Sequence, residues 1–311
     1  MKAYIIGGGE SALPELISWD FSHGFCSPCD SFEVSFLYEK ELLPALTAAA
    51  MFRAVHNGKT VFRGVVDEFE ISADRSGRVC VLRGRGMQAR LLDNQAESAE
   101  YTGVTVDTIL RRHAEPYGIT DADTSGIAKT AADISVSSGD SHWSVIRNFA
   151  EFCAGVKPRF NREGRLVFDG RSGGDRIKID SRTPVSALSY VQDRYGVITR
   201  AVVKNRIAAT EITVENPELT ALGGMCTRII NVPRKTGSDA MRHTGQYQIR
   251  ASSEEFIKCT LSVPTLFAAF PGDEAELDVQ QLGIAGLFLV WSTRCWADGK
   301  SAGTVLELVR K

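Results

Sequence analysis

Alternation of apolar and polar residues over the first 90 residues constrains the fold more than any other feature of the sequence. In the run SFEVSFLYE, residues 31–39, apolar side chains occupy every second position, as expected for a strand with one buried face. Two further strand-like runs flank Asn57-Gly58, a dipeptide that favours a two-residue hairpin because both turn positions need positive φ. We therefore predict an antiparallel, barrel-like or sandwich-like module at this end of the chain.

The middle of the chain changes to helical patterns, and the last 130 residues return to strand-like runs. A helix is predicted to begin after Thr105, a candidate N-cap, and to stop at Pro116. Asp298-Gly299 predicts a turn between the last two strands. The expected fold class is α+β and mainly β, with two β modules around a mixed α/β domain. The expected domains are a first β module at 1–93, with strands from 185–210 as candidates to complete it, a mixed domain at 94–184 and a second β module at 185–311.

Residues 141–170, SHWSVIRNFAEFCAGVKPRFNREGRLVFDG, predict a helix followed by a two-stranded hairpin. Apolar residues at i, i+3 and i+4 spacing, continued by Ala150 and Cys153, form one face of this helix, and Gly155 is expected to end it. The polar residues Arg147, Glu151, Arg159 and Arg165 are predicted to face solvent or a partner. The predicted structural core of this helix–hairpin unit is Trp143, Ile146, Phe149, Leu166 and Phe168.

The charge and cysteine content argue against several classes of function. The chain has 36 basic and 38 acidic residues spread along its length, so no basic face for nucleic acid is expected. Seven cysteines, an odd number with only one close pair, do not form the pattern of a secreted disulfide framework. We expect free thiols, assembly in a reducing cytoplasm, and no signal peptide or membrane anchor.

Two short motifs are candidates for binding sites. His23, Cys26, Cys29 and Asp30 are a candidate metal cluster, but zinc sites usually draw on two separated ligand pairs and no second pair follows. The alternative is a proline-containing turn that leads into a strand, and we expect no bound metal.

The run Gly7 to Ala12 matches the G-x-G-x-x-A pattern of dinucleotide-binding turns, yet Pro14 falls where the helix of such a fold should run. We expect no cofactor, no catalytic residues and no enzymatic activity, because no nucleophile elbow or tuned acid–base pair is recognisable.

Several stretches, in a particular order, resemble the baseplate hub proteins of phage tails and related contractile particles, the family that includes the late control protein D group. The resemblance covers nearly the whole chain and thins over 170–245. The stretches that carry it are SPCDSFEVSF, NGKTVFRGVVDEFEIS, LRGRGMQARLLDNQAE, GVTVDTILRRHAEPYGI, the helix–hairpin unit, and FPGDEAELDV with GLFLVWSTRCWADGKSAGTVLEL.

This resemblance implies a structural protein of the virion tail baseplate with two β-barrel modules similar to the tail-tube protein. It implies a ring of three copies that adapts a hexameric tail tube to a trimeric central spike. The implied partners are two further copies of the chain, the spike protein and the tube protein, with tape measure and baseplate wedge proteins as further candidates. The particle is a phage, a defective prophage or a phage-derived bacteriocin.

A cell-wall-binding or cell-wall-degrading tail component is the alternative. Such a carbohydrate site would need exposed aromatic residues, for which the four tryptophans are candidates, Trp291 and Trp296 lying at opposite strand parity. The predicted partner contacts of a hub lie in two segments expected to be exposed loops, 20–30 and 231–245.

Overall fold

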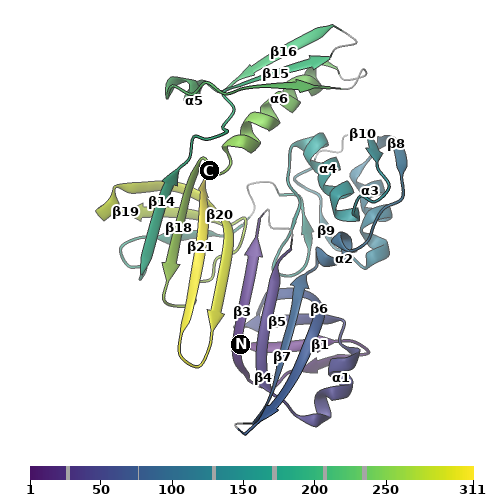
Figure 1. The fold of residues 1–311 in the computed structure, drawn as a ribbon, viewed down its shortest axis with the longest axis vertical. Coiled ribbons are helices and arrows are strands. Elements are labelled where there is room, and N and C mark those ends of the chain that lie inside the picture. Colours follow the sequence, from purple (N-terminus) through teal and green to yellow (C-terminus); the bar gives the residue numbers. More distant parts are fainter. Residues whose placement is uncertain (26–28, 76, 128–130, 170–173, 206–208, 233–236) are drawn as a thin grey trace. The chain divides into compact units, whose positions relative to one another are not determined.

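The computed structural model describes residues 1–311 except 26–28, 76, 128–130, 170–173, 206–208 and 233–236 (Figure 1). The chain divides into two compact units. Unit 1 comprises Met1–Leu188 and Leu261–Glu307, and unit 2 comprises Ser189–Thr260 and Leu308–Lys311. The predicted class, α+β and mainly β, is confirmed. Within the described part of the chain, no helix has the length and apolar character needed to cross a membrane.

The first module, defined here as β1 to β7, is a sheet of antiparallel strands in the order β3-β4-β7-β6-β5-β1-β2. Asn57 and Gly58 have φ of 49° and 75° between β5 and β6, which confirms the predicted hairpin. Phenylalanines fill its core, where the rings of Phe32 and Phe52 stack with centroids 4.0 Å apart. Its elements are β1 (Lys2–Ile6), β2 (Glu10–Ala12), β3 (Leu16–Gly24), β4 (Ser31–Leu37), η1 (Lys40–Leu42), α1 (Leu43–Ala48), β5 (Met51–His56), β6 (Lys59–Asp74) and β7 (Gly77–Gly86).

Gly84 in β7 is required by the close approach of its neighbours. A Cβ atom at this position would lie 2.0 Å from the Val65 carbonyl oxygen and 2.5 Å from the Phe32 ring. We expect Gly84→Ala to lower the free energy of unfolding by about 1–3 kcal/mol, as overpacking of a core does. Urea denaturation checks this, with Gly9→Ala as the control because nothing lies within 4 Å of a Cβ there. Equal stability of the two variants would contradict the packing argument.

The middle module has its own apolar core, separate from that of the first module. Ser141 caps α4, because its hydroxyl accepts a hydrogen bond from the Ser144 N–H at 3.1 Å, and Gly155 ends the helix with φ of 60°. Its elements are α2 (Ala89–Leu92), β8 (Ala99–Val104), α3 (Val106–His113), η2 (Glu115–Tyr117), β9 (Ala122–Asp123), β10 (Ala132–Val136), α4 (His142–Ala154), β11 (Arg159–Phe160) and β12 (Leu166–Val167).

The second module, defined here as β13, β14 and β18 to β21, comes from two separate stretches of the chain. The predicted turn between the last two strands is present, since the Asp298 N–H donates to the Ser301 carbonyl oxygen at 2.8 Å. The elements are β13 (Arg176–Ile179), β14 (Ala187–Gln192), β18 (Ile257–Val263), β19 (Glu274–Val279), η3 (Gln280–Leu282), β20 (Ile284–Ala297) and β21 (Ala302–Arg310).

The two β modules share one 13-stranded sheet and the same internal strand order. The first module runs β3-β4-β7-β6-β5-β1, and the second runs β14-β18-β21-β20-β19-β13. Antiparallel pairing of β20 with β3 joins them, so that strands from opposite ends of the chain lie side by side (Figure 1).

The sheet corrects the expectation of two β-barrel modules, because the described strands of neither module close into a barrel. It also shows that β3 is extended by β20 and not by a strand from 185–210. In that range β14 pairs with β18, and β15 (Arg200–Asn205) belongs to a separate sheet. Alternation in sequence specifies which residues form strands, but it carries no information on which strand lies next to which.

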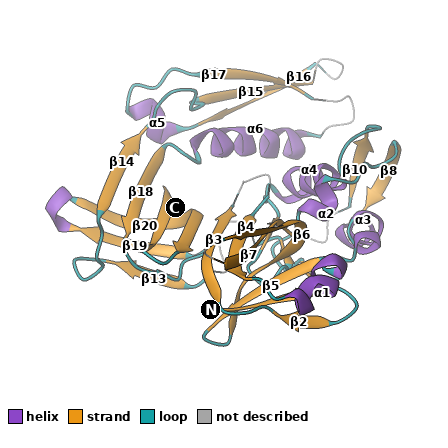
Figure 2. Ribbon diagram, turned by 60° about the horizontal axis from the view of Figure 1, so that its bottom comes forward, coloured by secondary structure: helices purple, strands orange, loops and turns teal. Residues whose placement is uncertain are grey.

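Unit 2 contains a three-stranded sheet, in the order β16-β15-β17, with α6 packed along it (Figure 2). The predicted loop at 231–245 is wrong for its second half, because α6 begins at Ser238; residues 233–236 lie outside the described residues. Met241, Gly245 and Ile249 recur every four residues, and Gly245 lies against Val203 and Val214 of the sheet. The remaining elements are β16 (Thr210–Glu215), α5 (Pro217–Ala221), β17 (Thr227–Asn231) and α6 (Ser238–Ser253).

Candidate functional site

The candidate metal cluster is brought together only in part. His23 Nδ1 lies 3.3 Å from the carboxylate of Asp30, and both residues are buried. The Cys29 thiol points instead toward the Gly86 carbonyl oxygen at 3.6 Å. Burial, and to a lesser extent the negative charge of Asp30, raises the pKa of this thiol to about 12. Among the residues that the structure describes, no three His, Cys, Asp or Glu side chains are grouped closely enough to hold a metal ion. Cys26 lies outside the described residues.

The predicted exposure of the 20–30 segment is wrong for the residues described there. His23, Phe25 and Asp30 are 6%, 4% and 6% exposed. Phe25 stacks on Trp291 of β20, with ring centroids 5.0 Å apart. Pairing of β3 with β20 therefore buries this segment, which the sequence alone does not indicate.

A polar cleft of about 480 Å³ lies within unit 1, where the middle module meets the second module. Arg159 forms an ion pair with Asp169 in this cleft and is 7% exposed, so its predicted solvent-facing position is wrong. Asp273 accepts backbone N–H hydrogen bonds from Asp175 and Phe270, at 2.9 and 2.8 Å, while burial raises its pKa. Arg159 thus has a carboxylate partner ten residues further along the chain, and the Asp273 carboxylate accepts from backbone groups near the start of β13 and β19.

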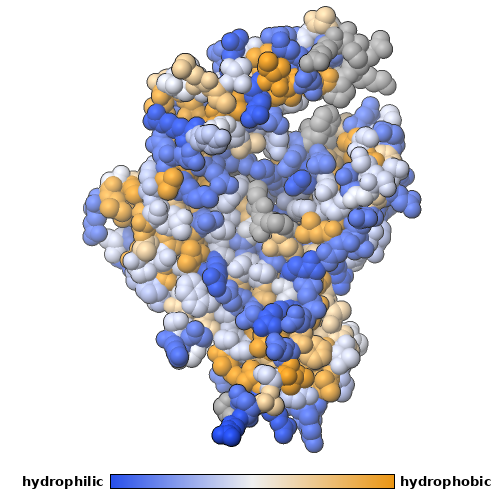
Figure 3. Space-filling view, in the orientation of Figure 1, coloured by the Kyte–Doolittle hydropathy of each residue, from blue (hydrophilic) through white to orange (hydrophobic). Residues whose placement is uncertain are grey.

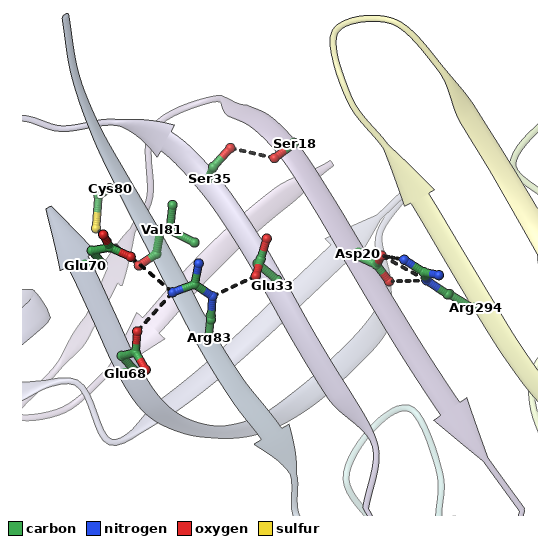
Figure 4. A network of polar contacts seen from close by, with 10 residues as sticks. All are labelled: Ser18, Asp20, Glu33, Ser35, Glu68, Glu70, Cys80, Val81, Arg83 and Arg294. Atoms are coloured by element: carbon green, nitrogen blue, oxygen red, sulfur yellow. Dashed lines mark hydrogen bonds and ion pairs between the residues drawn. The ribbon is translucent and has the colours of Figure 1, made fainter. Parts of the chain in front are cut away.

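The outer face of the sheet in unit 1 carries a row of ion pairs that crosses several strands (Figure 4). Arg83 of β7 contacts Glu33 at 2.7 Å, Glu68 at 2.9 Å and Glu70 at 3.3 Å. The hydrogen bonds to these carboxylates raise the pKa of Arg83, and the bond to Glu33 has the largest effect. Such exposed pairs add little stability individually, but opposite charges on facing strands favour one register.

The same face includes the junction between the modules. Arg294 of β20 donates to Asp20 of β3 at 2.7 Å, across the joint between the strands (Figure 4). A charged row that continues over this joint indicates that the outer face is one surface in both modules.

A hydrogen-bonded chain of four aromatic side chains links α3 to α4 in the middle module. The Nδ1 atoms of His113 and His142 lie 2.8 Å apart, so the N–H of one ring donates a hydrogen bond to the other ring. The Tyr101 hydroxyl contacts His113 Nε2 at 3.0 Å, and the Tyr117 hydroxyl contacts His142 Nε2 at 2.6 Å. The sequence does not reveal this pair, because the two histidines lie on different helices and meet only when α3 packs against α4.

Protonation of the histidine pair is unfavourable in the folded protein. Burial, followed by the charges of His142 and Arg112, lowers the pKa of His113 to about 4. Burial also lowers the pKa of His142, and a hydrogen bond to the backbone of Gln95 opposes this effect. Both histidines are therefore neutral at physiological pH, and the four hydrogen-bonded side chains link the two helices without charge.

The residues predicted as the core of the helix–hairpin unit lie together. All five are buried and belong to the apolar core of the middle module, with exposures between 0% and 7%. The side chain of Cys153 lies outside the described residues. The residues of this core are Trp143, Ile146, Phe149, Leu166 and Phe168.

Among the described residues of the large sheet, β6 and β14 have open edges, as do the end strands β2 and β13. The last part of β6, residues 67–74, pairs with β7 on one side and with no strand on the other. β14 is the first strand of the sheet and pairs only with β18. Apolar side chains are exposed at these edges, with Ile71 at 37%, Tyr190 at 41% and Val191 at 49%.

Other exposed apolar residues are distributed over both units. On the face in Figure 3, hydrophobic patches lie between hydrophilic residues, including over the first module. Unit 2 has two large side chains that are almost fully exposed, Tyr195 at 93% and Met225 at 94%. The first module exposes Ile17, Leu37 and Leu43.

Solved structures with the same fold are phage tail proteins and their relatives. The tail protein from Neisseria meningitidis MC58 superposes with a TM-score of 0.80 at 18% identity, over 100% of this chain and 96% of that one. The 43 kDa tail protein of prophage MuSo2 from Shewanella oneidensis gives 0.78 at 16%, over 100% and 98%. An E. coli component of the type VI secretion system, described as similar to the T4 tail proteins gp27 and gp5, gives 0.58 at 12%, over 96% and 74%.

The chain thus has the fold of phage tail proteins. Residues 89–170 match the family model for the second domain of gp44-like baseplate hub proteins. This match, which coincides with the middle module, confirms the resemblance to phage tail baseplate hub proteins. No curated protein sequence matches the chain.

Proposed function

We propose that this chain is a structural hub of a tail baseplate, in which three copies form a ring between a hexameric tail tube and a trimeric central spike. The tail-protein fold and the hub-type middle module support a place in the baseplate. The observation that carries the adaptor role is the shared strand order of the two β modules. Three copies with two equivalent modules each offer six similar faces to a sixfold tube, while the ring keeps the threefold symmetry of a spike.

The three segments expected from the sequence, 1–93, 94–184 and 185–311, are proposed as the building blocks of the hub. Separate apolar cores in the first and middle modules support the first two blocks. The third block is interrupted, since residues 193–256 of unit 2 lie in the sequence between β14 and β18 of the second module.

The four tryptophans do not favour the alternative of a cell-wall-binding or cell-wall-degrading component. Trp19, Trp143 and Trp291 are 9%, 7% and 7% exposed, and Trp296 packs against Gly303. A sugar-binding surface needs aromatic faces that are open to the ligand.

Co-expression tests the hub proposal. The chain is produced with the tube and spike proteins encoded beside it, and the complexes are examined by native mass measurement and electron microscopy. We expect a complex with three copies of the chain on one spike trimer. A chain that stays single and binds neither protein would refute the proposal, and hydrolysis of peptidoglycan by the purified chain would favour the alternative.

A further inference from the structure

The long central strands β6 and β20 are equivalent residue by residue. Val65 lies opposite Met51, the first residue of β5, and Leu289 lies opposite Glu274, the first residue of β19. Nine residues later, each strand reaches its turn, at Asp74 opposite Gly77 and at Asp298 bonded to Ser301.

A cross-strand polar pair occupies the same place in both modules and supports this equivalence. Glu68 contacts Arg83 of β7, and Ser292, its equivalent in β20, donates to Glu307 of β21. Positions 67–74 of β6 therefore correspond to positions 291–298 of β20.

In the second module, the last part of this strand has a neighbour on each side. β21 follows it on one side, and residues 292–297 pair antiparallel with β3 on the other. The contact buries the inner face of both strands: Thr293 is 2% exposed, and Phe21 of β3 is 1% exposed.

In the first module, the corresponding place is empty within the described part of the chain. Ile71, the equivalent of Cys295, is 37% exposed beside this vacant edge. The strand equivalent to β3 is β14, which occupies the same position in the order of the second module and whose outer edge is also vacant. One chain thus has an open edge at β6, the equivalent of β20. It also has an open edge at β14, the equivalent of the strand β3 that pairs with β20.

We propose that β14 of a second copy of this chain pairs antiparallel with residues 67–74 of β6, and so repeats between copies the joint that β3 and β20 form within one copy. This inference rests on the proposed function, because the strand joint would be the contact between neighbouring copies in the proposed ring. The contact is heterologous, because each copy uses β6 toward one neighbour and β14 toward the other, and such contacts close into rings. Pairing also removes two long open edges that would otherwise invite aggregation.

The backbone direction identifies the groups that make the joint. The Phe25 N–H donates to the Trp291 carbonyl oxygen at 2.7 Å, in register with the β20–β3 pairing. Hydrogen-bonded positions alternate in an antiparallel pair, so the backbone of Cys295 also faces β3. The N–H of Ile71, the equivalent residue, therefore points out of the open edge and away from β7.

Photo-crosslinking of the full chain tests the joint. Ser72, an exposed residue on the outer face of the edge, is replaced by p-benzoylphenylalanine, and copies labelled with ¹⁴N and ¹⁵N are mixed before irradiation. Mass spectrometry then identifies the linked peptides. We expect mixed-label adducts between position 72 and residues 187–192. Adducts only elsewhere in the chain, or no adducts between copies, would overturn the proposal.

A backbone substitution gives the second test. Ile71→Pro removes the outward N–H and leaves the hydrogen bonds between β6 and β7, so the adduct yield and the association constant should fall about tenfold or more. Ile71→Val keeps the N–H and is the matched control, with association near that of the unchanged chain. Circular dichroism and thermal unfolding verify that both variants fold. Equal association of the two variants would overturn the joint.

The two proposals can fail separately. A trimer on the spike whose copies crosslink through other segments would refute the strand joint and leave the hub function intact. Adducts from 72 to 187–192 in open filaments that bind no spike would support the joint and refute the hub function.

Discussion

Replacing Phe149 by alanine is expected to lower the free energy of unfolding by about 3–5 kcal/mol, as the loss of a buried aromatic ring does. Phe149 is 1% exposed on α4 and lies in the core of the middle module, so its removal leaves a cavity among residues that cannot all collapse into it. Urea denaturation followed by tryptophan fluorescence measures the change, because Trp143 belongs to the same core.

Phe149→Leu is the matched control for this prediction. Leucine keeps an apolar side chain in most of the space, and the loss of stability should be clearly smaller than for alanine. A stability loss below about 1 kcal/mol for Phe149→Ala would show that the residue is not part of a tightly packed core.

Acidification from pH 7 to pH 4 is expected to destabilise the middle module through the histidine pair. An unfolded chain protonates His113 near its ordinary pKa of 6.5, whereas the folded protein does so only at about 4. The unfolded state therefore binds more protons between these values, and stability is lost as pH falls through that window. The loss from His113 reaches up to about 3 kcal/mol at pH 4.

The variant His113→Gln is the control for this pH dependence. His113 faces His142 and Tyr101, and Arg112 lies over the Tyr101 ring at 5.2 Å. His113→Gln removes one titrating group, so its unfolding free energy should depend less on pH between 6.5 and 4. Urea denaturation at several pH values gives the comparison. An unchanged pH dependence in this variant would contradict the assignment.

Local signals in the sequence predicted local structure well. Asn57-Gly58 forms the expected hairpin, and Ser141 and Gly155 begin and end α4 as expected, because each acts on backbone groups within a few residues. The sequence did not predict the helix α6. Its apolar face is weak, because Gly245 stands where the sheet comes too close for a larger side chain.

The features most relevant to function depend on contacts that are distant in sequence. Asp20 and Arg294 are 274 residues apart, and no local pattern indicates that their strands are neighbours. The contact of His113 with His142 likewise requires the packing of α3 on α4. A sequence does not indicate open strand edges for the same reason. Whether an edge is open depends on which strands lie next to each other in the folded protein.

The pairing of β3 with β20 has a consequence for the order in which the protein acquires its structure during synthesis. β3 is among the first segments to leave the ribosome, yet its partner is made only when residues 284–297 have been translated. The edge of β3 stays uncovered throughout that time, and contacts of such long sequence separation form slowly. The nascent chain must therefore keep the open edge of β3 from pairing with other chains until its own last strands appear, a period in which chaperone binding would have the greatest effect on yield.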